Sequence, residues 1–321
     1  MKKNHNKTIL ITCGTGFFGK SIISYFKKEN PRLKKIIVLS RNPQKLDNIF
    51  NTNNFPFEIE YIKQDIREPI KYSEPIDYLI HTGAESSTSV GVSNPILMMD
   101  LVLKGTKNIL EYAKQQKIKR LLFISSGAVY GKQTRNINYI PEEYLGAPDP
   151  LNPLNAYGCA KRQAENLCAL YYHHYGVNYS VARCFTFIGQ YLPLDAHFAI
   201  GNFIRDGLNG GSIVVTGNGT TVRSYLYADD LAKSLWTILL KGNTGEAYNV
   251  GSDEAISISD LAHLVSSCFD DKPEVIIKGK PDGEIDRYVP RVEKIKNELC
   301  VSERMTLVDG IKRTIDFHMK N

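Results

Sequence analysis

The chain of 321 residues has 42% hydrophobic residues, 23% charged residues and a formal net charge of +6 at pH 7, values that are ordinary for a globular protein. No basic run alternates with aromatic residues and no stretch approaches the roughly 20 apolar residues of a membrane span, so neither nucleic-acid binding nor membrane insertion is expected. The apolar run near the N-terminus is too short for a signal peptide. Six cysteines without Cys-x-x-Cys spacing and seven histidines without ligand spacing indicate a cytoplasmic protein with no metal site.

A strand, a glycine-rich turn and a helix open the chain. Residues 9–11 are a short apolar run typical of a buried parallel strand, and helical spacing follows in residues 21–28. Between them stand Gly14, Gly16 and Gly19. Glycines so placed let the chain turn tightly, let backbone N–H groups approach a pyrophosphate and let the helix pack on the strand. The segment therefore predicts the first unit of a dinucleotide-binding fold.

Strands and helices alternate through the first half of the chain. The predicted strands are 35–40, 57–62, 77–81, 121–126 and 177–184, and the predicted helices are 95–116 and 155–175. This alternation predicts an α/β fold with a doubly wound parallel sheet. After Gly189, prolines, glycines and short strand-like pieces mix with helices, which indicates a smaller second lobe.

Tyr157 and Lys161 form a Tyr-x-x-x-Lys pair at one-turn spacing, after the strand and turn of residues 121–131. These segments resemble the extended short-chain dehydrogenase/reductases of the NAD(P)-dependent nucleotide-sugar epimerase/dehydratase family. Further matches follow in the family's order at 81–86, 182–189, 223–230 and 248–252.

The resemblance covers nearly the whole chain and implies two domains. It implies an NAD(P)-binding Rossmann domain of residues 1–189 plus about 225–252, and a nucleotide-sugar-binding lobe of about 190–224 plus 253–321. In the first domain, residues 229–240 are expected to form a helix and residues 247–250 a strand. Family members are often dimers, and the helices at 95–116 and 155–175 are the candidate interface of a homodimer.

The expected catalytic residues are Tyr157, Lys161 and Ser126. Hydride transfer at a carbinol carbon needs a proton taken from, or given to, its oxygen, and a free phenol is a poor base at its pKa of about 10. A nearby ammonium and an oxidised nicotinamide both favour the phenolate. Ser125 or Ser126 can hydrogen-bond the reacting oxygen, and the resemblance favours Ser126.

The cofactor site departs from the family at Cys13, which stands at the first position of the Gly-x-x-Gly-x-x-Gly pattern. Its side chain either crowds the adenosine side or is tolerated as a small residue. The second strand ends in Ser40-Arg41 without an acid, which favours the 2′-phosphate of NADP over the ribose hydroxyl of NAD. The expected cofactor-binding residues are Gly14, Gly16, Phe17, Phe18, Gly19, Ser40, Arg41, Asp65, Ile66, Thr82, Gly83, Ala84, Ser125, Tyr157 and Lys161.

The reaction expected from the sequence is reduction of a 4-ketosugar at C4. Dehydratases of the family usually carry an acid pair where this chain has Gly127 and Ala128, although Glu85 is a partial counter-argument. An epimerase, a 4,6-dehydratase and a regulator that senses NADP without turnover stay as alternatives. The expected contacts to the nucleotide sugar are Glu85, Ser126, Thr186, Asn202, Arg223 and Arg287.

Overall fold

The computed structural model describes residues 7–50, 54–82, 94–196, 198–280 and 286–320. The contacts divide the chain into two compact units. Unit 1 comprises Met1–Gly131, Ala147–Cys184 and Ala232–Tyr248. Unit 2 comprises Lys132–Gly146, Phe185–Leu231 and Asn249–Asn321. The functional division into a cofactor domain and a substrate lobe stays a prediction.

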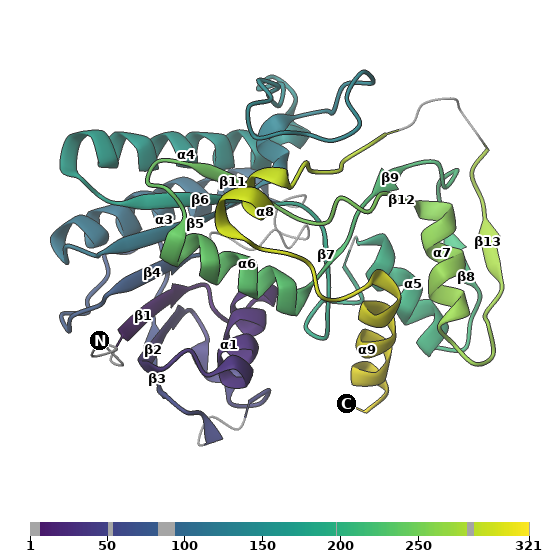
Figure 1. Cartoon of the computed structure of the whole chain (residues 1–321), viewed down its shortest axis with the longest axis horizontal. Helices are drawn as coiled ribbons and strands as arrows, with labels where there is room; N and C mark the ends of the chain where they lie inside the picture. The colour runs from purple at the N-terminus through teal and green to yellow at the C-terminus, as the bar shows by residue number, and fades with distance from the viewer. Residues whose placement is uncertain (1–6, 51–53, 83–93, 197, 281–285, 321) are drawn as a thin grey trace. The chain divides into compact units, whose positions relative to one another are not determined.

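Unit 1 is built on a seven-stranded sheet in the order β11-β6-β5-β4-β1-β2-β3 (Figure 1). Its strands are β1 Lys7–Thr12, β2 Leu33–Ser40, β3 Glu58–Lys63, β4 Tyr78–His81, β5 Arg120–Ser126, β6 Tyr179–Cys184 and β11 Ala247–Val250. Every pairing from β6 to β3 is parallel. The predicted doubly wound α/β fold is confirmed.

Helices cover both faces of this sheet, α3 and α4 on one side and α1 and α6 on the other (Figure 1). The helices are α1 Phe17–Glu29, α3 Pro95–Gln115, α4 Ala156–Tyr175 and α6 Ala228–Lys241. Alternate residues of β1 serve the two faces, and Leu10 packs in the core under α3 and α4. On the other side Phe26 of α1 meets Trp236 of α6 edge to face, with ring centroids 5.0 Å apart. Burial on both faces explains why the strands are continuously apolar.

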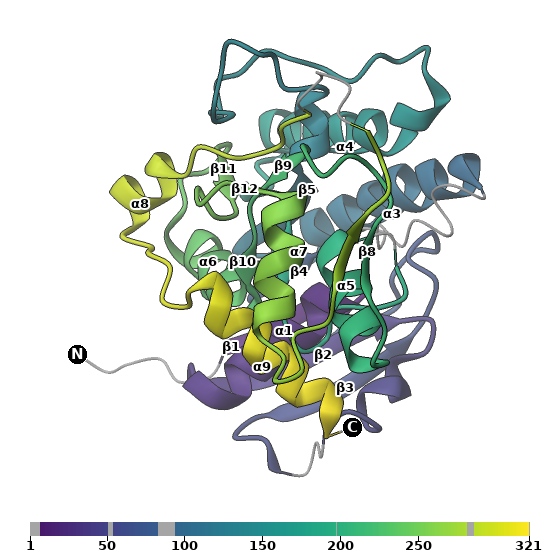
Figure 2. The ribbon, with the colours of Figure 1, turned by 90° about the vertical axis from the view of Figure 1, so that its right-hand side faces the viewer.

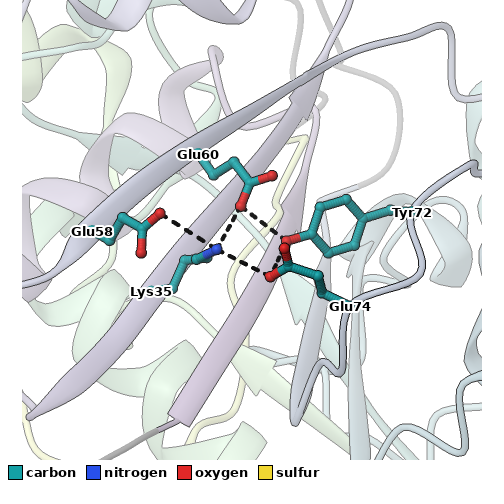
Figure 3. Close-up of polar contacts among 5 residues, drawn as sticks. All are labelled: Lys35, Glu58, Glu60, Tyr72 and Glu74. Atoms are coloured by element: carbon teal, nitrogen blue, oxygen red, sulfur yellow. Dashed lines mark hydrogen bonds and ion pairs between the residues drawn. The ribbon is translucent and has the colours of Figure 1, made fainter.

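A buried lysine of β2, Lys35, forms ion pairs with carboxylates of the neighbouring edge strand β3 (Figure 3). The Nζ atom of Lys35 lies 2.7 Å from Glu60, 3.2 Å from Glu74 and 3.4 Å from Glu58, and its side chain is only 9% exposed. The hydroxyl of Tyr72 donates to Glu60 and Glu74 at 2.9 and 3.2 Å. These carboxylates raise the pKa of Lys35, the hydrogen bond to Glu60 most strongly. We call these five residues the Lys35 cluster.

Unit 2 combines helices with three two-stranded sheets, which pair β10 with β7, β12 with β9 and β13 with β8. Its helices are α5 Ala199–Leu208, α7 Ile258–Ser267, α8 Glu293–Leu299 and α9 Leu307–Met319. Its strands are β7 Phe187–Ile188, β8 Ile213–Val215, β9 Val222–Arg223, β10 Leu226–Tyr227, β12 Ile256–Ser257 and β13 Val275–Ile277. Helices α5 and α7 pack beside β8, with β13 along the same side of the unit (Figure 2).

Short 3-10 helices connect several of these elements. They are η1 Pro43–Leu46, η3 Gly127–Tyr130 and η4 Pro153–Asn155. None of the helices in the described ranges is long and apolar enough to cross a membrane.

Candidate active site

The turn between β1 and α1 is closed by glycines that leave no room for a side chain. A Cβ added at Gly19 would lie 2.2 Å from the carbonyl oxygen of Gly14, and one added at Gly14 would lie 2.8 Å from Val38 Cγ1. Gly16 caps α1 without any side-chain hydrogen bond, and the first helical turn, which begins with Phe17 and Phe18, holds no acidic residue. An open helix N-terminus beside bare backbone fits the pyrophosphate of a dinucleotide.

Cys13 adopts φ +51, a left-handed conformation that favours glycine. Its carbonyl oxygen accepts a hydrogen bond from the N–H of Gly16 at 3.3 Å, so the turn forms despite the side chain. The backbone therefore accommodates cysteine, at a cost of about 1 kcal/mol for an L-residue in this region.

At the end of β2, Ser40 is half-buried and Arg41 is exposed. The Ser40 hydroxyl lies 2.9 Å from the Thr15 hydroxyl, which joins this strand end to the glycine turn. Asp65, after β3, is bound by Arg67 through Nε at 3.0 Å and Nη2 at 2.7 Å, and these contacts lower the pKa of its carboxyl group. The carboxylate of Asp65 is thus already engaged within the protein, and Ile66 beside it is buried in the core.

Lys161 is almost fully buried on α4, 1% exposed, and donates from Nζ to the carbonyl oxygen of Ile124 at 2.8 Å. The ammonium lies 5.0 Å from the ring centroid of Phe123 and 5.8 Å from that of Tyr157. Burial lowers the pKa of Lys161 to about 8. The structure thus brings the two residues of the Tyr-x-x-x-Lys pair together on one face of the helix, with the ammonium in an apolar setting.

The two candidate serines at the end of β5 have different partners. Ser125 is buried and its hydroxyl donates to Glu165 at 2.5 Å. Ser126 is half-buried and caps η3, where its oxygen accepts from the N–H of Ala128 at 3.2 Å. A Cβ at Gly158 would lie 2.6 Å from the carbonyl oxygen of Ala128, so the turn packs tightly against α4. Ser126 is therefore the serine that stays available to a reacting oxygen.

His81 is a buried residue to which the sequence assigned no role. Its ring lies 2.7 Å from the Thr12 hydroxyl through Nδ1 and 3.2 Å from the Thr106 hydroxyl through Nε2, which links β1, β4 and α3. Burial, and then the nearby charge of Lys161, lower the pKa of His81 to about 3, so the ring is neutral. The sequence signal for this residue is a histidine at the end of the apolar strand predicted at 77–81.

The predicted contact residues after β4 are only partly described. Thr82 donates from its hydroxyl to the carbonyl oxygen of Thr12 at 2.7 Å. Gly83, Ala84 and Glu85 lie outside the described residues.

The two predicted substrate arginines lie on adjacent backbone segments of unit 2. Val222, the residue before Arg223, forms a β-bridge with Arg287. Arg223 donates from Nη2 to Asp286 at 2.6 Å. Arg287 donates from Nε to the carbonyl oxygen of Asn138 at 2.6 Å, with its guanidinium 5.5 Å from the ring centroid of Tyr139. Guanidinium groups are suited to bind the oxygens of an anionic ligand.

The weaker candidates, Thr186 and Asn202, make contacts within unit 2. The Thr186 hydroxyl donates to the carbonyl oxygen of Ser224. Asn202, on α5, accepts from Arg205 at 3.1 Å. Across the described segments, no group of three or more His, Cys, Asp or Glu side chains is placed to hold a metal ion.

Comparison with known proteins decides the family. The sequence model of the NAD dependent epimerase/dehydratase family matches residues 9–251. The chain belongs to this family.

Relatives in the family have several named activities. The chain is 30% identical to a putative UDP-glucose 4-epimerase of Methanocaldococcus jannaschii over 98% of each protein. It is 28% identical to UDP-glucuronic acid decarboxylase 1 of Xenopus tropicalis, with 100% of this chain and 74% of that protein covered. The fold is that of the UDP-glucose 4-epimerase of Thermotoga maritima, solved with UDP-glucose, at a TM-score of 0.84, 24% identity and coverage of 98% and 99%.

Proposed function

We propose that this protein is a nucleotide-sugar 4-epimerase, which inverts C4 of a hexose by oxidising and then re-reducing that carbon. The observation that supports this most is the placement of the Tyr157 ring 5.8 Å from the buried ammonium of Lys161. A phenol beside a desolvated ammonium is suited to exchange a proton with a sugar hydroxyl near neutral pH.

In this proposal each residue has a defined task. A bound NAD(P) supplies the hydride acceptor for the oxidation and the hydride donor for the reduction. Tyr157 removes the proton from the C4 hydroxyl and later returns a proton to the C4 oxygen. Lys161 stabilises the phenolate, and Ser126 donates a hydrogen bond that orients the C4 oxygen.

The turn after β5 favours epimerisation over 4,6-dehydration. Elimination across C5 and C6 needs a base and an acid near the sugar, and the positions that resemble the dehydratase acids hold Gly127 and Ala128. The 30% identity to the putative UDP-glucose 4-epimerase, over 98% of both proteins, also supports the epimerase. A decarboxylase would share the oxidation at C4 but would act on a uronic acid.

A 4-ketosugar reductase, the reaction expected from the sequence, is the second candidate. It is favoured by Ser40 and Arg41 at the end of β2, since an exposed guanidinium suits the 2′-phosphate of an exchangeable NADPH. We infer from the same residues that NADP binds more tightly than NAD in either reaction.

We also propose that Arg223 and Arg287 bind the pyrophosphate of the nucleotide sugar. Their backbones are adjacent through the Val222–Arg287 bridge, and both guanidinium groups lie beside aromatic rings, those of Tyr288 and Tyr139. Such stacking fixes the planar guanidinium for bidentate contacts to phosphate oxygens.

The test is a screen of UDP-, dTDP-, GDP- and CDP-hexoses with the purified protein, followed by NMR of the products. Epimerisation predicts interconversion of two sugars that differ only at C4, with no net consumption of NADPH. Stoichiometric consumption of NADPH with a 4-keto-6-deoxy sugar would establish the reductase instead.

We further propose a homodimer formed through α3 and α4. Apolar side chains on these helices are exposed, with Ile96 at 77%, Tyr175 at 57%, Tyr172 at 47% and Leu170 at 43%. Apolar surface of this kind is stabilised when a second copy covers it. Light scattering on the purified chain measures the molar mass directly, and a monomer at micromolar concentration would contradict the proposal.

A further inference from the structure

We propose that Glu165 is a positioning residue for the C4 chemistry, holding the end of β5 against α4 and supplying the negative charge behind Lys161. This inference rests on the proposed function. It concerns a network that we call the Glu165 clamp, made of Ser125, Tyr130, Glu165 and Arg183.

Glu165 lies on the same face of α4 as the proposed catalytic pair. Tyr157, Lys161 and Glu165 follow one another at intervals of four residues, so their side chains stack along one side of the helix. The side chain of Glu165 is 13% exposed. A carboxylate this far from water needs strong partners.

The guanidinium group of Arg183, on β6, supplies the hydrogen bonds that Glu165 needs. It donates from Nη2 to Oε2 of Glu165 at 2.7 Å and from Nε to both carboxylate oxygens at 3.1 and 3.2 Å. Arg183 also donates from Nη1 to the Tyr130 hydroxyl at 2.9 Å, with its guanidinium 4.9 Å from that ring centroid. The clamp therefore joins α4, β6 and η3 through charge-assisted hydrogen bonds.

Two consecutive residues of β5 are bonded by side chains of α4. Lys161 bonds the carbonyl oxygen of Ile124 at 2.8 Å, and Glu165 accepts from the hydroxyl of Ser125, the next residue, at 2.5 Å. The residue after that is Ser126, which we assign to the reacting oxygen. Two side chains of α4 thus bond the two residues before Ser126, one through the backbone of Ile124 and one through the side chain of Ser125. They therefore set the position of Ser126 relative to Tyr157 on the same helix.

Glu165 acts on Lys161 electrostatically as well. The titratable groups that face Lys161 are Cys13 from the β1 turn, His81 from β4, Cys184 from β6, and Tyr157, Glu165 and Cys168 from α4. His81 is neutral, and burial keeps the thiols of Cys168 and Cys184 protonated by raising their pKa values. Glu165 is thus the carboxylate among these groups, and Arg183 lies behind it as an opposing positive charge.

Glu165→Gln removes the negative charge and leaves Arg183 in place, so the pKa of Lys161 should fall further below its value of about 8. The direct measurement is an NMR titration of protein labelled with ¹³C at lysine Cε, with the Lys161 signal assigned by its loss in Lys161→Met. We expect that signal to titrate at lower pH in Glu165→Gln. The readout needs no substrate, so it stands even if the proposed reaction is wrong.

Two matched variants separate charge from structure. Glu60→Gln removes a carboxylate from the other buried lysine, Lys35, and should leave the titration of Lys161 unchanged. Glu165→Asp keeps the charge, so it should keep the Lys161 titration close to that of the wild type. An unshifted Lys161 signal in Glu165→Gln would overturn the electrostatic part of the proposal.

The positioning part is tested by turnover. Glu165→Gln should lower kcat by about 10- to 100-fold through displacement of Ser126, with a smaller effect on KM, and should move the alkaline limb of the kcat profile to lower pH. The double variant Glu165→Gln/Arg183→Met avoids an unpaired buried guanidinium, and we expect it to fold and still to lose turnover. Wild-type kcat in the folded double variant would overturn the positioning role. Absence of turnover in the wild type would instead refute the proposed function.

Discussion

Two buried lysines of unit 1 have opposite surroundings. Lys35, on β2 beside the edge strand β3, has three carboxylates within 3.4 Å of its Nζ atom, and these raise its pKa (Figure 3). Lys161, on α4, bonds a backbone carbonyl and lies within 5.8 Å of the centroids of two aromatic rings, and burial lowers its pKa to about 8.

The presence or absence of bonded carboxylates distinguishes a structural cation from a functional one. A cation neutralised by fixed carboxylates stabilises the fold and offers little to a ligand. A cation that is desolvated without a directly bonded carboxylate destabilises the fold, and a protein retains it where its charge has a task. We therefore assign Lys35 to stability and Lys161 to chemistry.

The largest expected effect is that of Lys161→Met. Loss of the ammonium should reduce turnover at least about 100-fold, the usual scale for acid–base catalysis. The melting temperature at pH 7 should not fall, since an apolar side chain replaces a desolvated charge. Steady-state kinetics and calorimetry on the same preparation check both statements, and near-wild-type turnover would contradict our assignment of Lys161.

The same variant should change the pH dependence of stability. Because the pKa of Lys161 is lowered from 10.5 to about 8, the unfolded chain binds more protons between these values, and wild-type stability gains from Lys161 as the pH rises through this window. Lys161→Met should flatten that rise. Urea unfolding at pH 7.5 and 10 measures it, and an equal rise in both proteins would mean that Lys161 is not desolvated.

Lys35→Met should show the reverse pattern. Three carboxylates lose their shared cation, so the free energy of unfolding should fall by about 2 kcal/mol while kcat stays unchanged. The pKa of Lys35 is raised, so its contribution is fully present below pH 10.5 and is lost as the pH rises through the folded value. Lys34→Met, at the exposed neighbouring residue, is the matched control and should be nearly neutral. A loss of turnover in Lys35→Met would break the comparison.

Arg41 extends the comparison to an exposed cation at the end of β2. If the Arg41 guanidinium binds the 2′-phosphate of NADP, Arg41→Asp should reverse the cofactor preference. The substitution should weaken the binding of NADP about tenfold and strengthen the binding of NAD about tenfold. Calorimetric titration with both nucleotides measures this. A wild type that prefers NAD would show that Arg41 does not select the cofactor.

Arg223 tests whether a cation that is paired with a carboxylate can still bind a ligand, because its Nη2 atom lies 2.6 Å from a carboxylate oxygen of Asp286. If Arg223 nevertheless binds the pyrophosphate, that phosphate must displace Asp286, and Asp286→Asn should tighten UDP binding several-fold. No change, or weaker binding, would place Arg223 with Lys35 among the structural cations.

Much of the fold could be predicted because local patterns determine it. The apolar run at 35–40 and the helical spacing at 95–116 match β2 Leu33–Ser40 and α3 Pro95–Gln115 within a few residues. Burial on both faces makes such strands readable from composition alone.

The partners of charged residues could not be predicted, because the fold brings them together over long separations. Lys35 reads as an ordinary charge in a strand, yet its partner Glu74 is 39 residues away. Glu165 and Arg183 lie on different elements, and their contact depends on how α4 packs on β6. The resemblance favours Ser126 over Ser125, and this choice stays a prediction. The bond from Ser125 to Glu165 could not be predicted from the sequence and appears only in the structure.

The most direct test of the proposed function follows a deuterium label at C4 of nucleotide hexoses. We predict that the wild type converts a C4-deuterated hexose into its C4 epimer with the deuterium retained at C4 and no net change in NADPH, and that Tyr157→Phe loses this conversion at least about 100-fold while still binding the cofactor. Deuterium appearing at C6 of a 6-deoxy product, or conversion that survives unchanged in Tyr157→Phe, would contradict it.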